Sequence, residues 1–162
     1  MRIALVVSIA PFDHDEDQTV VEETASALGS GGHQVDIVRL PFASSASSLV
    51  RQLTAYRTLD LTDFADVMIC FDSPAHLVRH PRKIAWYLSR SSADGSSANA
   101  SLRDSIRRAD TAAMGEASRI FAGSESIGRR LREVNETESE LLLPRTSFDR
   151  QEWSSVADRL LS

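Results

Sequence analysis

The stretch at residues 28–42, LGSGGHQVDIVRLPF, constrains the fold of this chain more than any other. A helix ends there on glycines, a short polar turn follows, and an apolar strand begins at once. This is the second half of a strand–helix–strand unit whose first strand covers residues 2–9. Strands that are apolar on both faces predict a parallel sheet with helices on its two sides. In such open sheets, ligands bind at the carboxyl ends of the strands.

The same kind of pattern continues along the chain and predicts an alternating order of elements. We expect the helix over residues 47–57 to turn Leu49, Val50, Leu53 and Tyr56 inward. Right-handed crossovers then give an α/β fold, a single Rossmann-like, doubly wound parallel sheet with the first strand near its centre. Strands are predicted at 2–9, 34–40, 66–71, 82–88, 119–122 and 139–143, helices at 17–30, 47–57, 101–117, 124–135 and 150–161, one helical turn at 74–80 and a low-complexity loop at 89–100.

Composition excludes several classes of function. The 162 residues are enough for one domain, and a formal charge of −5 offers no basic field for nucleic acid. The single Cys70 lies in an apolar run, so we expect a buried, inert thiol and no internal disulfide. No segment reaches the roughly 18–20 apolar residues of a membrane span, and no signal peptide is apparent. We therefore expect a cytoplasmic protein without cofactor or metal.

Two segments carry a more specific signal. Residues 79–86, RHPRKIAW, combine His–Pro, a lysine and a tryptophan, and residues 110–124, DTAAMGEASRIFAGS, follow the pattern D-x-x-x-x-x-E-A-x-x-I-F-x-x-S. Together with residues 28–42 and ELLLP at 140–144, they resemble the N-terminal half of group 1 glycosyltransferases. These are retaining, nucleotide-sugar-dependent enzymes of the GT-B fold. The resemblance covers most of residues 1–145, in the same order.

The resemblance implies a division of labour. In that family the N-terminal Rossmann-like domain mainly binds the acceptor, and a C-terminal domain holds most of the nucleotide-sugar site. We expect these 162 residues to contain only the first of the two domains. Residues 148–161, FDRQEWSSVADRLL, look like the family's final helix, which returns to the N-terminal domain. Residues 1–145 are thus expected to form an acceptor-side domain, with residues 146–162 packed back on it. The implied partners are a sugar acceptor, a nucleotide-sugar, and the missing domain or a second copy.

The sequence departs from the family pattern at two loops. The loop after the first strand, APFDHDED, is acidic and free of glycine, so it would repel a diphosphate. The histidine-bearing segment that usually follows the tryptophan strand is replaced by YLSRSSADGSS. Both departures weigh against catalysis, even with a C-terminal domain supplied in trans, and a non-catalytic interaction or dimerisation module is the alternative. A flavodoxin- or response-regulator-like signalling domain is a third, weaker interpretation. The response-regulator type would need a lysine after the fifth strand, and none lies near Ala122.

Candidate cleft residues follow the first and third predicted strands. Asp13 and His14 could ligate a cation, although acidic residues before a helix also favour its N-terminus. Asp72, Ser73 and His76 come directly after the third strand, at the carboxyl edge. His76 could bind acceptor hydroxyls or act as an acid–base group. The structural alternative is a capping Asp72 or Ser73 with a surface histidine.

A further candidate, Ser124, follows the fifth strand. It reads as the N-cap of the next helix, whose free N–H groups could also accept an anion. His80 precedes a proline and is expected to be structural. Arg129, Arg130 and Arg132 read as a solvated helix face.

Overall fold

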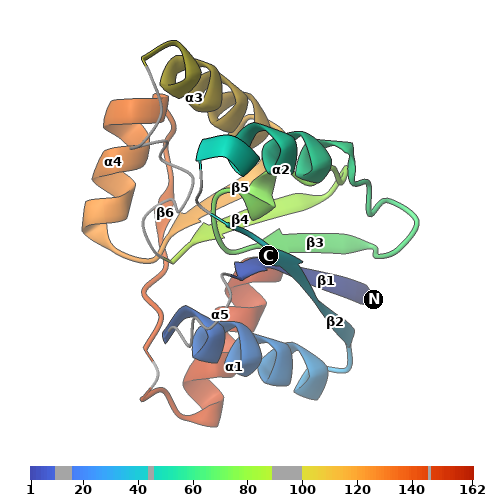
Figure 1. Ribbon diagram of the computed structural model, residues 1–162. Helices are drawn as coiled ribbons and strands as arrows, with labels where there is room; N and C mark the ends of the chain where they lie inside the picture. Colours follow the sequence, from blue (N-terminus) through green and yellow to red (C-terminus); the bar gives the residue numbers. More distant parts are fainter. Residues whose placement is uncertain (10–15, 44–45, 89–99, 146) are drawn as a thin grey trace.

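The computed structural model describes residues 1–9, 16–43, 46–88, 100–145 and 147–162 (Figure 1). The strands are Arg2–Ile9 (β1), Gln34–Pro41 (β2), Val67–Cys70 (β3), Lys83–Tyr87 (β4), Ala117–Ala122 (β5) and Glu140–Leu141 (β6). The helices are Glu16–Ser30 (α1), Ala46–Thr58 (α2), Ala100–Met114 (α3), Glu125–Asn135 (α4) and Arg150–Leu161 (α5), with a 3-10 turn, Ala75–Leu77 (η1). Asp13 and His14 lie outside the described residues.

All six strands join one parallel sheet in the order β2-β1-β3-β4-β5-β6. The fold is therefore the predicted α/β, Rossmann-like type. The chain moves from β1 to β2 on one side and then returns to place β3 on the other side of β1. The strand order thus reverses between β1 and β3, which is where sheets of this kind open to a ligand.

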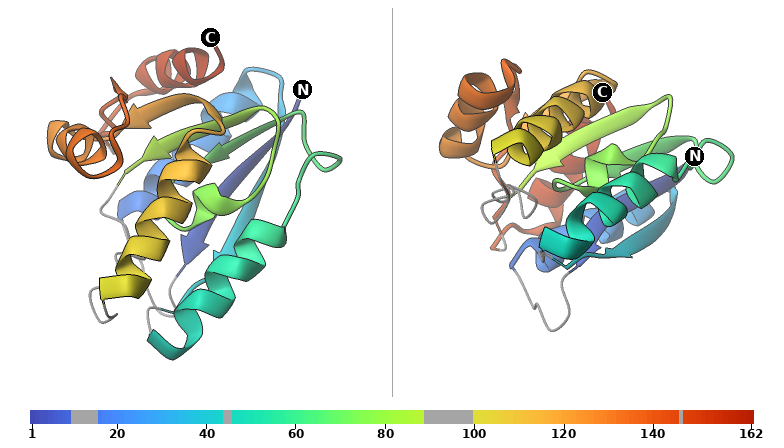
Figure 2. Two further views of the ribbon diagram at one scale, coloured as in Figure 1. Left: turned by 90° about the horizontal axis from the view of Figure 1, so that it is seen from above. Right: turned by 45° about the horizontal axis from the view of Figure 1, so that its top comes forward.

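Helices cover both faces of the sheet. Figure 1 shows α2, α3 and α4 on one side and α1 and α5 on the other, and the left view of Figure 2 shows α2 and α3 side by side over the strands. Strand β1 explains why both faces are needed. Ile3, Leu5 and Val7 pack in the core beneath α1 and α5, whereas Ala4 and Val6 pack beneath the other three helices. Successive side chains of a strand point to opposite faces, so an unbroken apolar strand requires two covers.

The last helix, α5, lies against α1. Trp153, Val156 and Leu160 are buried in the same core as Val20 and Leu28 of α1. A capping box opens the helix, in which the Asp149 carboxylate accepts from the Gln151 and Glu152 N–H groups and Glu152 accepts from the Asp149 N–H. The chain therefore closes the second face of the sheet with its own final segment.

The structure corrects some local predictions. Val50 is 51% exposed, so its predicted inward orientation is wrong, while Leu49 and Tyr56 are buried as expected. Helix α3 ends at Met114 rather than at residue 117, because β5 already begins at Ala117.

No helix within the described ranges is both long enough and apolar enough to cross a bilayer.

Candidate functional site

Asp72 sits at the point where the strand order reverses. Its carboxylate accepts hydrogen bonds from the Ser8 N–H (2.8 Å), the Ser8 hydroxyl (2.9 Å) and the Ala75 N–H (3.0 Å). Burial raises the pKa of this carboxyl to about 6, against the lowering effect of these hydrogen bonds. Asp72 thus joins the end of β1 to the start of η1, and its oxygens are already occupied by donors of the chain.

His76 is fully buried beside Asp72 rather than on the surface, which corrects the structural alternative offered above. Its Nδ1 lies 3.3 Å from the Asp72 carbonyl oxygen, and its Nε2 lies 3.2 Å from Oδ1 of Asp110 in α3. The Nε2 contact has the distance of an ion pair without the alignment of a hydrogen bond. Both ring nitrogens thus face oxygen acceptors. His76 therefore links η1 to α3 from within the core.

A cavity of about 380 Å³ lies between α3 and α4, and we call it the α3–α4 cavity. Its apolar lining comes from Ile106 and Met114 of α3 and Ile127 and Leu131 of α4. The volume falls within the range of small-molecule sites in proteins, roughly 300–1,000 Å³. The remaining lining is polar or exposed: Ser73, Tyr87, Arg103, Asp104, Arg107, Asp110, Ser126, Arg130, Val134 and Asn135.

The buried wall of this cavity carries three polar groups. Ser73 and Tyr87 are 2% and 4% exposed, and they come from the carboxyl ends of β3 and β4. The Ser73 hydroxyl donates to Oδ1 of Asp110 at 3.3 Å. The Tyr87 hydroxyl is buried and has no hydrogen-bond partner among the described residues. Burial also raises its pKa well above the usual range, so it remains a protonated donor.

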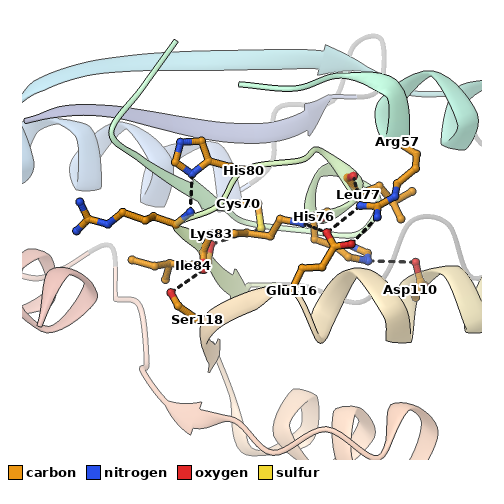
Figure 3. A network of polar contacts seen from close by, with 11 residues as sticks. Arg57, Cys70, His76, Leu77, His80, Lys83, Ile84, Asp110, Glu116 and Ser118 are labelled. Carbon is orange, nitrogen blue, oxygen red and sulfur yellow. Dashed lines mark hydrogen bonds and ion pairs between the residues drawn. The ribbon is translucent and has the colours of Figure 1, made fainter. Parts of the chain in front are cut away.

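Residues of the 79–86 and 110–124 segments form a polar network next to this wall (Figure 3). Lys83 is fully buried, and its ammonium donates to the His76 carbonyl at 2.9 Å and to Glu116 at 3.1 Å. Glu116 also pairs with both terminal nitrogens of Arg57. The Arg57 hydrogen bonds, followed by those of Lys83, lower the pKa of Glu116 to about 2. The network ties β4, α2 and the start of β5 together.

Two further motif residues have structural partners. The His80 ring lies with Nε2 3.0 Å from the Ala65 carbonyl oxygen, while its Nδ1 accepts the Arg82 N–H at 3.0 Å. This confirms the structural role predicted for His80. The Trp86 indole N–H donates to the Leu142 carbonyl at 2.9 Å, which fastens the segment after β6 to the sheet. Much of the RHPRKIAW motif is thus explained by the packing of the fold.

The structure separates the predicted candidates. Of these, Ser73 lines the α3–α4 cavity, whereas Asp72, His76 and Ser124 do not. Ser124 is the N-cap of α4, as predicted, and its hydroxyl accepts the Ile127 N–H. Cys70 is buried, and its burial raises the pKa of the thiol to about 12.

Sequence reasoning missed most of the cavity. Arg130 was assigned to a solvated helix face, yet it lines the cavity. A stripe of polar residues follows the helical spacing on α3: Arg103, Arg107 and Asp110. This spacing is the sequence feature from which part of the cavity could be predicted. Tyr87 could not be found in this way, because it ends a strand that is buried throughout.

No group of three or more metal-ligating side chains occurs in the described part of the chain. Compared with models of known protein families, the chain matches none. A search among curated proteins likewise finds no significant match.

Proposed function

We propose that this chain is the acceptor-side domain of a retaining, nucleotide-sugar-dependent glycosyltransferase, and that the α3–α4 cavity binds the sugar acceptor. The observation that carries the proposal is the cavity's buried wall, where Ser73, Tyr87 and Asp110 face the same space. Sugar hydroxyls both donate and accept hydrogen bonds. The Asp110 carboxylate is an acceptor, the Tyr87 phenol is a free donor, and the apolar lining suits the C–H faces of a sugar ring.

The residue pattern at 79–86 and 110–124 supports the choice of this enzyme family. The cavity supports the proposal that this domain binds the acceptor rather than the nucleotide-sugar. In the complete reaction, the bond between the sugar and the nucleoside diphosphate breaks, and the acceptor hydroxyl forms the new glycosidic bond and releases its proton. The donor site would belong to a second domain outside these 162 residues. On this proposal, the chain by itself binds and orients the acceptor but does not transfer sugar.

A titration followed by two-dimensional NMR tests this proposal. Mono- and disaccharides should shift the amide resonances of α3, α4 and Ser73, and UDP-glucose and GDP-mannose should not bind at micromolar concentration. A Val134→Trp substitution at the cavity, where Val134 is 42% exposed, should abolish the shifts. Val50→Trp is the matched control, because Val50 is 51% exposed on α2 and does not line the cavity. Micromolar binding of either nucleotide-sugar would contradict the proposal that the donor site belongs to a second domain.

A second candidate function, an interaction or dimerisation module, has its own observation. Strand β6 pairs only with β5 among the described strands, and Leu141 within β6 and Leu143 just after it are 39% and 41% exposed. Apolar side chains along an open sheet edge favour association with another chain. Sedimentation equilibrium of the wild type and of Leu141→Lys would distinguish the two: a dimer that the substitution dissociates favours the module.

A further inference from the structure

The α3–α4 cavity combines its buried wall with an excess of positive charge. Three arginines and two aspartates line it, although the whole chain carries a formal charge of −5. Arg107 pairs with Asp104 at 3.5 Å on the same helix. Arg103 of α3 and Arg130 of α4 form no ion pair or hydrogen bond within the described ranges. Two arginines without partners therefore face one small cavity from neighbouring helices, in a protein that is acidic overall.

The second observation is independent of charge and comes from the buried wall. A hydroxyl buried without a hydrogen bond is uncommon in folded proteins, because it loses its contacts with water and gains none in return. Among the described residues, the Tyr87 hydroxyl is in this position, and Tyr87 lines the cavity. Beside it, Oδ2 of Asp110 also has no partner among the described residues, while Oδ1 is engaged by Ser73. A donor and an acceptor thus remain available at the cavity wall.

We infer that the acceptor bound in the α3–α4 cavity carries an anionic group, most simply a phosphate, in addition to sugar-type hydroxyls. Arg103 and Arg130 would bind the anionic group, because the guanidinium fork matches the oxygens of phosphate or carboxylate. The Tyr87 hydroxyl would donate to the sugar, and Asp110 would accept from it. This inference rests on the proposed function, since it names the substrate class of the same site.

Calorimetric titration of the full chain with matched ligands tests the inference. Glucose 6-phosphate, mannose 6-phosphate and fructose 6-phosphate are compared with the same sugars without phosphate, with glucuronate, and with inorganic phosphate. At least one sugar phosphate should bind about tenfold or more tightly than its neutral sugar, as expected for charged hydrogen bonds. Tighter binding of glucuronate than of every sugar phosphate would identify a carboxylate as the anionic group.

Three variants connect the binding to the named residues. Arg103→Gln and Arg130→Gln should each weaken sugar-phosphate binding about tenfold and leave binding of the neutral sugar unchanged. Arg129→Gln is the matched control on the same helix, because Arg129 does not line the cavity. Tyr87→Phe removes only the unpartnered hydroxyl, so it should weaken the sugar and its phosphate alike without lowering the melting temperature.

The outcomes separate this inference from the proposed function. Equal affinity for sugar and sugar phosphate, with no effect of Arg103→Gln or Arg130→Gln, would overturn the anionic class and leave a neutral acceptor site standing. Inorganic phosphate that binds as tightly as any sugar phosphate, with no effect of Tyr87→Phe, would reduce the site to an anion site and overturn the inference. No binding of any sugar or sugar phosphate would overturn both proposals.

Discussion

The Asp72 carboxylate accepts two hydrogen bonds from Ser8, one from its backbone N–H and one from its hydroxyl. The residues lie 64 positions apart, at the carboxyl ends of the neighbouring strands β1 and β3. This pair therefore holds together the two strands between which the strand order reverses. It also places Ser73 and η1 where they reach the α3–α4 cavity and α3.

The buried Asp72 carboxyl predicts a pH dependence of stability. Its pKa of about 6 in the folded state lies above the ordinary 3.8, so the folded state holds the proton more tightly than the unfolded state. This contribution to stability is fully present below the ordinary pKa of 3.8 and is lost as the pH rises through 6, by an amount on the order of 3 kcal/mol. Urea unfolding of the wild type and of Asp72→Asn at pH 4.5, 6 and 7.5 measures it.

The raised pKa of Asp72 fixes the direction in which stability should change with pH. The free energy of unfolding of the wild type, minus that of Asp72→Asn, should grow as the pH falls from 7.5 to 4.5. A difference that is constant over this range, or that shrinks toward low pH, would refute the assigned role of burial.

The Glu116 carboxylate should make the stability of the protein depend on pH in the opposite direction. Its pKa is lowered to about 2 by Arg57 and Lys83, so its contribution to stability is present above pH 4.5 and is lost as the pH falls toward 2. Because the carboxylate is 38% exposed and screened by water, we expect Glu116→Gln to cost about 1–2 kcal/mol at pH 7. Chemical denaturation at pH 7 and pH 2.5 should show that this cost largely disappears at the lower pH.

Glu138→Gln provides the matched control for this prediction. Glu138 also pairs with an arginine, Arg132, but both side chains are mostly exposed and no buried lysine depends on them. We expect no measurable change in stability, because water screens this exposed pair. Equal effects of the two substitutions would show that the buried ammonium of Lys83 does not depend on Glu116.

Alanine substitutions at two glycines should change the stability of the protein in opposite directions. A Cβ at Gly123 would lie 2.9 Å from the Tyr87 carbonyl oxygen and 3.1 Å from the Leu88 Cα, both backbone atoms that cannot turn aside. We expect Gly123→Ala to destabilise the protein by about 1–3 kcal/mol. Gly29 lies in α1 with no atom within 4 Å of a new Cβ, so Gly29→Ala should stabilise it by about 0.5–1 kcal/mol. Thermal unfolding of both variants gives the comparison.

The capping box of α5 predicts a graded loss of stability. Asp149→Ala removes the acceptor of two backbone N–H groups and should cost about 1 kcal/mol. Asp149→Asn keeps a good N-cap and should cost much less. Urea unfolding followed by tryptophan fluorescence measures both, since Trp86 and Trp153 are both buried in the folded protein. An alanine variant as stable as the asparagine variant would argue against the cap.

The secondary structure could be predicted from the sequence because its signals are local. The glycines after α1, the apolar run of β1 and the N-cap Ser124 each act on residues within a few positions. Predictions failed where position depended on the rest of the fold. Val50 follows the apolar spacing of its helix, yet its side chain remains 51% exposed.

The sequence by itself determined that this chain forms a parallel sheet with helices on both faces, since strands apolar on both sides are stable only when both are covered. The tertiary structure decided what those elements bring together. Ser73, Tyr87, Arg103 and Arg130 come from four separate segments, and only the packing of α3 and α4 places them around one cavity. The physical reason is the sequence separation over which each feature is determined. The apolar pattern depends on residues that are near neighbours in the sequence. A cavity and the partner of a buried charge depend on side chains that are distant in the sequence.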